Sequence, residues 1–190
     1  MKKEIEQIFQ ESIRVKEETL KKNGSAIENS VEAVIKALQK NNKLLFFGNG
    51  GSAADSQHIA AEFIGRFQKE RKALPAIALT TDSSILTALS NDYGVDILFA
   101  RQIEGLGQKG DVAFGISTSG RSKNVIAGLR QAKKMGLVTI ALTGNDGGEA
   151  AGLSDIAIIV PSKVTARIQE AHILIAHTIC ELVEKQLFKN

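Results

Sequence analysis

The sequence predicts an α/β protein: a three-layer αβα sandwich with a five-stranded parallel sheet, preceded by N-terminal helices. Five short apolar runs support this prediction, at residues 44–47, 76–79, 112–116, 138–142 and 156–160. Each is a continuous run rather than an alternation, which suits strands buried on both faces. Helical stretches lie between most of the runs, and parallel strands need such crossover connections.

The first 42 residues are predicted to form two helices. Residues 2–22 and 25–41 each carry apolar side chains at roughly helical spacing. Ser25 is followed three residues later by Glu28, which is a capping-box pattern. We therefore expect the second helix to begin at Ser25.

The remaining helices alternate with the apolar runs. Helical patterns are predicted near residues 53–67, 84–106 and 122–135, and a long helix over about 164–187 closes the chain. We see no internal repeat or linker, so we predict a single domain over residues 1–190. In an open parallel sheet, ligands bind beyond the carboxyl ends of the strands. The loops after the runs are therefore the places to look for a site.

Composition and charge are those of an ordinary globular protein. Of 190 residues, 43% are hydrophobic and 24% charged, with a formal net charge of +3. This weak positive charge could help attract a phosphorylated substrate, but it is too small to indicate nucleic-acid binding. The single cysteine, Cys180, excludes an internal disulfide and reads as a core residue. With no apolar signal core or membrane-spanning stretch, the sequence predicts a cytoplasmic protein.

The loop after the third apolar run has the features of a phosphate site. A helix N-terminus offers unpaired N–H groups, and neighbouring hydroxyls add hydrogen bonds to phosphate oxygens. One hydroxyl is enough to cap a helix, whereas this loop has four within six residues, at Ser117, Thr118, Ser119 and Ser122. We interpret the loop as an anion site. No Lys follows its glycine, so the nucleotide-hydrolysing P-loop pattern is absent.

The loop after the first run is rich in glycine. Residues 48–53 read Gly-Asn-Gly-Gly-Ser-Ala, which satisfies the dinucleotide fingerprint G-x-G-x-x-A. That fingerprint expects an acidic residue about 20 positions further on, and Asp82 is about 30 positions away. The glycines are better explained by a tight strand-to-helix turn that lets the backbone approach a ligand.

Two helical segments carry the side chains best suited to chemistry. His58 and Glu62, four residues apart, share one helical face, and Gln169 and His177 lie on one side of the closing helix. If the two helices meet, these groups suit a zinc ion or a proton-transferring pair. Spacing alone leaves two other readings open. His58 and Glu62 could be an exposed helical pair, and His177, among isoleucines, could be a core histidine.

These motifs together resemble the phosphoheptose isomerases of the sugar isomerase (SIS) fold. The resemblance runs from the N-terminal helices to the C-terminal helix with the motifs in register. It is carried by Gly48-Asn49-Gly50-Gly51-Ser52, Gln57-His58, Glu62, Gly65-Arg66, Asn91-Asp92 with Gly94, Ser117-Thr118-Ser119-Gly120, Arg167-Ile168-Gln169-Glu170, His172 and His177.

The resemblance implies a SIS fold with flavodoxin-like strand order and a homotetramer with active sites at subunit contacts. Residues 1–42 would contribute to those contacts. The implied reaction converts D-sedoheptulose 7-phosphate to D-glycero-D-manno-heptose 7-phosphate through an enediol. This is the first step toward the ADP-heptose of lipopolysaccharide core or related surface glycans. The implied ligands are the sugar phosphate and one zinc ion per subunit, with no nucleic acid or membrane partner.

The resemblance also assigns roles residue by residue. Glu62 and His177 match the catalytic acid/base pair. The zinc-binding positions match His58, Glu62, Gln169 and His177. The substrate-binding positions match Asn49, Gly50, Gly51, Ser52, Glu62, Asn91, Asp92, Ser117, Thr118, Ser119, Ser122 and Gln169.

Three other functions remain alternatives. The DnaA initiator-associating protein shares the fold and the tetramer but lacks the Glu and the His at positions 62 and 177, both of which are present here. Other SIS-fold proteins, such as arabinose-phosphate isomerases or hexosamine-phosphate-binding regulators, usually have a different catalytic set or additional domains. The third alternative, a dinucleotide-dependent oxidoreductase, is supported only by the glycine loop.

Overall fold

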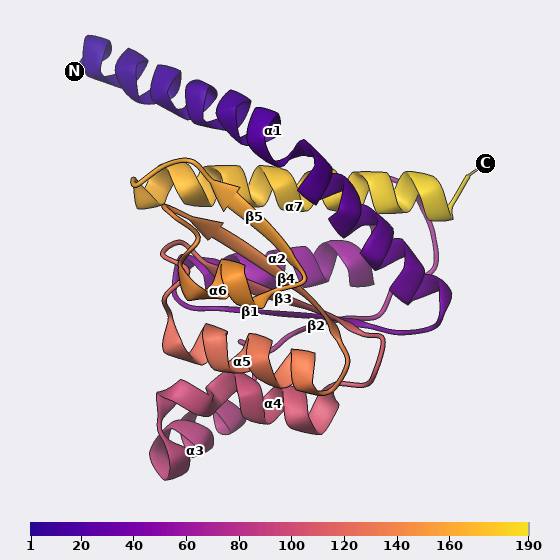
Figure 1. Cartoon of the computed structure of the whole chain (residues 1–190). Helices are drawn as coiled ribbons and strands as arrows, with labels where there is room; N and C mark the ends of the chain where they lie inside the picture. Colours follow the sequence, from indigo (N-terminus) through magenta and orange to yellow (C-terminus); the bar gives the residue numbers. More distant parts are fainter. Residues whose placement is uncertain (190) are drawn as a thin grey trace.

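A computed structural model describes residues 1–189, and its centre is a five-stranded parallel sheet (Figure 1). The strand order is β2-β1-β3-β4-β5, and every neighbouring pair is parallel. The strands are β1 (Leu44–Gly48), β2 (Ala76–Ala78), β3 (Val112–Ser117), β4 (Val138–Gly144) and β5 (Ile156–Val160). The predicted α/β class, parallel sheet and flavodoxin-like order are confirmed.

Helices cover both faces of this sheet. One layer contains α1 (Lys2–Gln39), α2 (Gly51–Ile64) and α7 (Thr165–Leu187), and the other is built mainly from α4 (Leu98–Leu106) and α5 (Lys123–Lys134) (Figure 1). The side chains of β1 alternate between the two layers, as strand geometry requires. Leu44 and Phe46 belong to the core under α2 and α7, whereas Leu45 and Phe47 belong to the core under α4 and α5.

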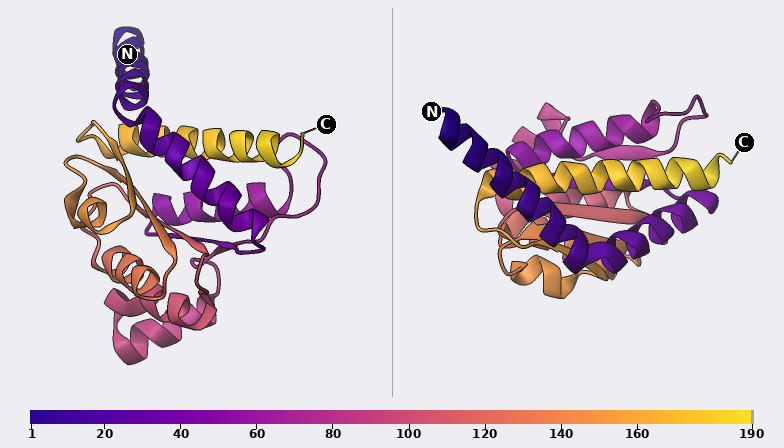
Figure 2. Two further views of the ribbon diagram at one scale, coloured as in Figure 1. Left: turned by 45° about the vertical axis from the view of Figure 1, so that its right-hand side comes forward. Right: turned by 90° about the horizontal axis from the view of Figure 1, so that it is seen from above.

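The N-terminal region is one helix, so the prediction of two was wrong. α1 runs without interruption through Gly24 and Ser25, and Ser25 caps nothing. The side chain of Asn23 pairs with the backbone of β5 and stabilises the helix at this point. Its side-chain amide donates to the carbonyl of Ile159 at 3.0 Å, and its side-chain oxygen accepts from the N–H of Ile159 at 2.9 Å. These bonds tie the middle of α1 to β5, and its N-terminal half projects beyond the sheet (Figure 2).

The segment between β2 and β3 is divided more finely than predicted. Instead of one helix over 84–106, it contains α3 (Ser83–Tyr93), a 3-10 turn (Val95–Ile97) and α4. Gly94 separates α3 from the turn with a φ of 85°, which ends the helix. A short helix that the sequence did not predict, α6 (Gly148–Leu153), lies between β4 and β5.

None of the helices within residues 1–189 combines the length and the apolar character needed to cross a membrane. The predicted domain extends to residue 190, which lies outside the described part of the chain.

Candidate active site

Helices α2 and α7 meet and bring together three of the predicted side chains. His58 Nε2 lies 3.1 Å from Glu62 Oε1 and 3.3 Å from His177 Nε2. One ligand atom from each of the three residues lies within 4.8 Å of the others. The two helices therefore meet, a condition that the sequence had left open. His177 is half-buried and faces the other imidazole, so it is not a core histidine.

The donor set suits a metal ion. It consists of two imidazole nitrogens and a carboxylate oxygen, which zinc binds readily. Ligands about 2.1 Å from a tetrahedral ion lie about 3.4 Å apart, close to the spacings around His58. The two Nε2 atoms lie 3.3 Å apart, so both could bind one cation.

Gln169 occupies a different part of this surface. A Cβ added at Gly51 would overlap the amide nitrogen of Gln169, so the amide lies over the first residue of α2. The turn leading into α2 also needs glycine at two other positions. Gly50 has a φ of 55°, and a Cβ at Gly48 would lie 2.7 Å from the Ile116 carbonyl. The glycine loop thus allows α7 to approach the start of α2.

Asp55 belongs to the same region, although the sequence analysis did not single it out. Its Oδ2 atom is buried and has no hydrogen-bond partner within residues 1–189. Burial raises the pKa of the Asp55 carboxyl, and the charges of His58 and His177 act in the opposite direction. Asp55, His58 and Glu62 follow one another at three and four residues along α2, so helical periodicity is the signal that could have found it.

A buried ion pair holds α2 against α7 near the imidazoles. The side chains of Arg71 and Glu184 are 2% and 3% exposed, and Arg71 Nε lies 2.9 Å from Glu184 Oε2. Arg71 Nη2 also donates to the Glu62 carbonyl at 2.8 Å. Glu184 accepts from the N–H groups of residues 67–69, and Phe67 packs on His177 with ring centroids 5.5 Å apart. This network holds α2 and α7 together beside Glu62 and His177.

His172, the remaining histidine, faces the sheet and not the imidazole cluster. Its Nε2 lies 3.0 Å from the Thr143 carbonyl, and the side chain is buried. Burial lowers the pKa of His172 to about 4, with the hydrogen bond to Thr143 opposing it. A neutral, buried imidazole of this kind has a structural role.

The predicted anion loop lies at the carboxyl end of β3 and leads into α5. Ser117 Oγ and Ser122 Oγ are 3.0 Å apart. Ser122 is the residue that precedes α5, but its side chain makes no capping bond to the helix. Helix capping therefore does not account for these hydroxyls, and the unpaired N–H groups at the start of α5 remain available to an anion.

The glycine loop is joined to the first turn of α5, directly after the anion loop. Asn49 Nδ2 donates to Asn124 Oδ1 at 2.8 Å, and Asn124 Nδ2 donates to Asn49 Oδ1 at 2.9 Å. The two loops follow neighbouring strands, β1 and β3, so their contact is the one expected at this edge of a parallel sheet. No sequence pattern identified Asn124, because its partner lies 75 positions away.

Asn91 and Asp92 are the predicted site residues that the structure leaves apart. They lie on α3, which has no buried residue, and their side chains bond to each other at 2.8 Å. Within residues 1–189, neither side chain forms a hydrogen bond with any predicted site residue outside this pair.

The fold and these loops define a SIS-domain protein, and the SIS domain family model matches residues 7–144. Two relatives named phosphoheptose isomerase are similar over almost the full chain. The protein from Aquifex aeolicus is 54% identical over 187 residues, covering 98% of each chain. The protein from Sulfurimonas denitrificans is 52% identical over 192 residues, covering 99% of this chain and 97% of the relative.

Two solved structures agree with this assignment. The phosphoheptose isomerase from Neisseria gonorrhoeae superposes with a TM-score of 0.92 at 44% identity, covering 97% of this chain and 98% of that one. The phosphoheptose isomerase from Francisella tularensis also gives 0.92, at 37% identity, covering 96% and 97%. The chain belongs to the phosphoheptose isomerase family.

Proposed function

We propose that this protein converts D-sedoheptulose 7-phosphate to D-glycero-D-manno-heptose 7-phosphate. The observation that carries the proposal is the meeting of Glu62, on α2, with His58 and His177 within 4.8 Å. A carboxylate beside an imidazole can move protons on adjacent carbon and oxygen atoms, which an aldose–ketose isomerisation requires. Family membership supports the choice of a seven-carbon sugar phosphate.

In the proposed complex, the two loops hold the ends of the substrate. Ser117, Thr118, Ser119 and Ser122 bind the phosphate together with the start of α5, and Asn49, Gly50, Gly51 and Ser52 contact the sugar. Gln169 would contact the sugar as well, and its position over Gly51 supports this role. Binding the phosphate far from the reacting carbons orients C1 and C2 toward the imidazole cluster.

The chemistry is then a transfer of two protons. Glu62 removes a proton from C1 of the ketose while His177 gives one to the C2 oxygen, which produces an enediol. Glu62 returns its proton to C2 and His177 takes the proton of the C1 hydroxyl, which leaves the aldose. Both side chains end as they began, so no other reactant is consumed.

A zinc ion fits this site. His58, Glu62 and His177 would hold it. The family resemblance also implies Gln169 as a ligand, although its amide lies over Gly51 at the start of α2 in this structure. When bound, zinc polarises the C1 and C2 oxygens and stabilises negative charge on them.

We further infer that the active enzyme is a cytoplasmic homotetramer with sites at subunit contacts. Residues 1–42 would supply part of those contacts. Exposed apolar side chains on the projecting half of α1 support this, at Ile5, Ile8, Phe9 and Ile13. Asn91 and Asp92 lie on an exposed helix apart from the other site residues, as expected if subunit assembly completes the site. The product would supply ADP-heptose synthesis for lipopolysaccharide core or related surface glycans.

A coupled assay tests the proposal against its alternative, a non-catalytic tetramer that binds the replication initiator. The purified, zinc-supplemented protein is supplied with sedoheptulose 7-phosphate, and with unphosphorylated sedoheptulose as the control sugar. We expect heptose 7-phosphate to form from the first and not from the second. No turnover of the phosphorylated sugar by the zinc-loaded protein would refute the proposal.

A further inference from the structure

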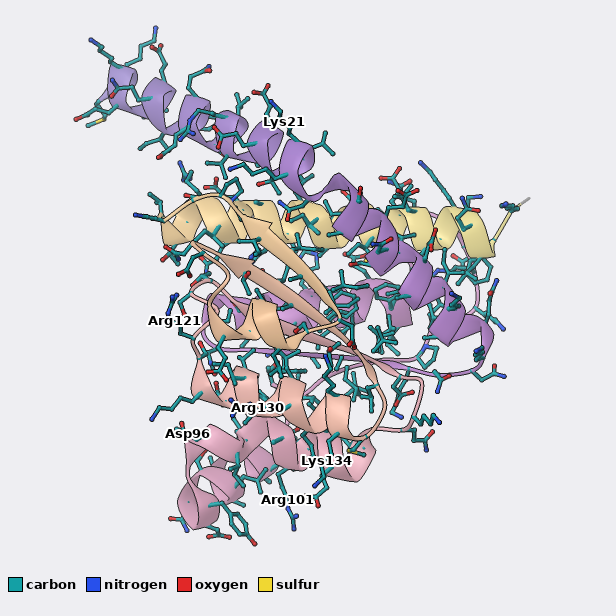
Figure 3. All side chains as sticks on the ribbon, viewed as in Figure 1. Lys21, Asp96, Arg101, Arg121, Arg130 and Lys134 are labelled. Carbon is teal, nitrogen blue, oxygen red and sulfur yellow. The ribbon has the colours of Figure 1, made fainter. Side chains whose placement is uncertain are left out.

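The turn that follows β4, residues 145–148, lies against the anion loop. Asn145 Nδ2 donates to the carbonyl of Thr118 at 3.2 Å. Arg121 Nη1 donates to the carbonyl of Ser119 at 3.1 Å, and the same guanidinium forms a two-pronged pair with Asp146 at 2.8 and 2.7 Å. Arg121 lies at the edge of the molecule where the strands end (Figure 3). Asn145 of the β4 turn thus holds the Thr118 carbonyl, and Arg121, paired with Asp146 of that turn, holds the Ser119 carbonyl.

The main chains of the two turns are also in contact. The N–H of Ala150 donates to the Gly120 carbonyl at 3.0 Å. A Cβ added at Gly120 would overlap the Gly147 carbonyl, and one at Gly148 would overlap the Gly120 carbonyl. All three glycines have positive φ values, of 65°, 86° and 54°. Asp146 Oδ1 accepts from the Gly148 N–H at 3.1 Å and holds the glycine turn in place.

This contact determines where the Ser119 N–H points. In a trans peptide, the carbonyl and the following N–H point in opposite directions. Because Asn145 holds the Thr118 carbonyl, the Ser119 N–H is directed away from the β4 turn. The next two N–H groups are already used, by the Ser117 carbonyl and by Ser119 Oγ. Within residues 1–189, the Ser119 N–H has no acceptor in the protein, which leaves it available to an anion.

We propose that Asn145 and Asp146 are positioning residues that preorganise the anion loop for the substrate phosphate. This inference rests on the proposed function, because it assumes that the loop binds phosphate. Asn145 sets the Thr118–Ser119 peptide directly. Asp146 acts through Arg121 and through the glycine turn. Donors fixed before binding lose little freedom when the ligand arrives, so loosening them weakens binding.

Two variants separate these contributions. Asn145 has a φ of 57°, and glycine tolerates that conformation, so Asn145→Gly removes the side-chain amide without straining the backbone. Asp146→Asn keeps the size of the side chain and removes its charge. We expect each variant to raise both the KM for sedoheptulose 7-phosphate and the inhibition constant of inorganic phosphate about three- to tenfold, as loss of one or two hydrogen bonds does. We expect kcat to stay within about twofold, because the imidazole cluster is untouched.

Glu149→Gln is the matched control. It removes a carboxylate from α6 three residues after Asp146 and breaks an exposed pair with Arg130 on α5. We expect wild-type constants for it. Ser119→Ala, which alters the loop itself, is the positive reference.

The outcomes distinguish this inference from the function on which it rests. If inorganic phosphate does not inhibit the wild type, the proposed phosphate site is wrong and the inference falls with it. If phosphate inhibits the wild type and Ser119→Ala weakens that inhibition, unchanged inhibition constants in Asn145→Gly and Asp146→Asn would overturn the inference alone. A lower melting temperature with an unchanged inhibition constant would overturn it too, because it would show a purely structural role.

Discussion

Glu62 and His177 are the two side chains on which the proposed chemistry depends. We expect Glu62→Gln and His177→Gln each to lower kcat by about 100-fold or more, since a positioned acid or base contributes about 10²- to 10⁴-fold. Steady-state kinetics of the purified variants measure the change. Glu104→Gln, which removes an exposed carboxylate paired with Arg101 on α4, should keep the wild-type kcat. Wild-type turnover in either site variant would refute the acid/base assignment.

The Ser119 hydroxyl is one of the proposed hydrogen-bond donors to the substrate phosphate. Ser119→Ala removes one donor to a charged phosphate, and hydrogen bonds to charged groups contribute about 1.5–3 kcal/mol. We therefore expect KM to rise roughly tenfold or more with little change in kcat. Initial-rate measurements with sedoheptulose 7-phosphate decide this, and an unchanged KM would count against the loop as the phosphate site.

At the scale of elements, the contact between α2 and α7 depends on the buried pair of Arg71 and Glu184. Glu184→Gln leaves the Arg71 charge buried without its partner, which costs about 3–5 kcal/mol of unfolding free energy. Urea denaturation measures the loss. Glu181→Gln on the same helix breaks a partly exposed pair with Lys185 and should cost less than about 1 kcal/mol. Equal stability of the two variants would mean that the buried network is not what holds the helices together.

The strands were easier to predict from the sequence than the ends of the helices or the tertiary contacts of the site. Apolar runs located all five strands. The central strands β1, β3 and β4 are buried on both faces, which leaves that mark on the sequence, and the edge strands β2 and β5 are apolar although partly exposed. The capping-box pattern at Ser25 was misleading, because the bonds between Asn23 and β5 depend on residues 136 positions apart. Periodicity placed His58 and Glu62 on one face and Gln169 and His177 on one side of the closing helix, but it could not show that the two helices meet. Asn124 and Asn145 were missed because their significance comes from tertiary neighbours, whereas Asp55 lies at helical spacing from His58 and could have been found.

At the scale of the whole molecule, His172 links stability to pH. Its pKa is about 4 in the folded protein, against 6.5 for an unperturbed imidazole, so below pH 6.5 the unfolded chain binds the proton more readily. The free energy of unfolding should therefore fall as the pH is lowered from 6.5 to about 4, by on the order of 3 kcal/mol from this group. Denaturation measured between pH 6.5 and 4 should show that the free energy of unfolding falls less steeply with pH in His172→Gln than in the wild type. Parallel slopes would exclude this contribution.

The most direct test of the central claim follows hydrogen exchange at the reacting carbons. Sedoheptulose 7-phosphate is incubated in D2O with the wild type and with Glu62→Gln, and proton NMR follows C1 of the ketose and C2 of the aldose. If Glu62 moves the carbon-bound proton, the wild type introduces deuterium at these carbons as it forms the aldose, and Glu62→Gln loses both exchange and conversion. Exchange by Glu62→Gln at the wild-type rate would contradict the proposed site.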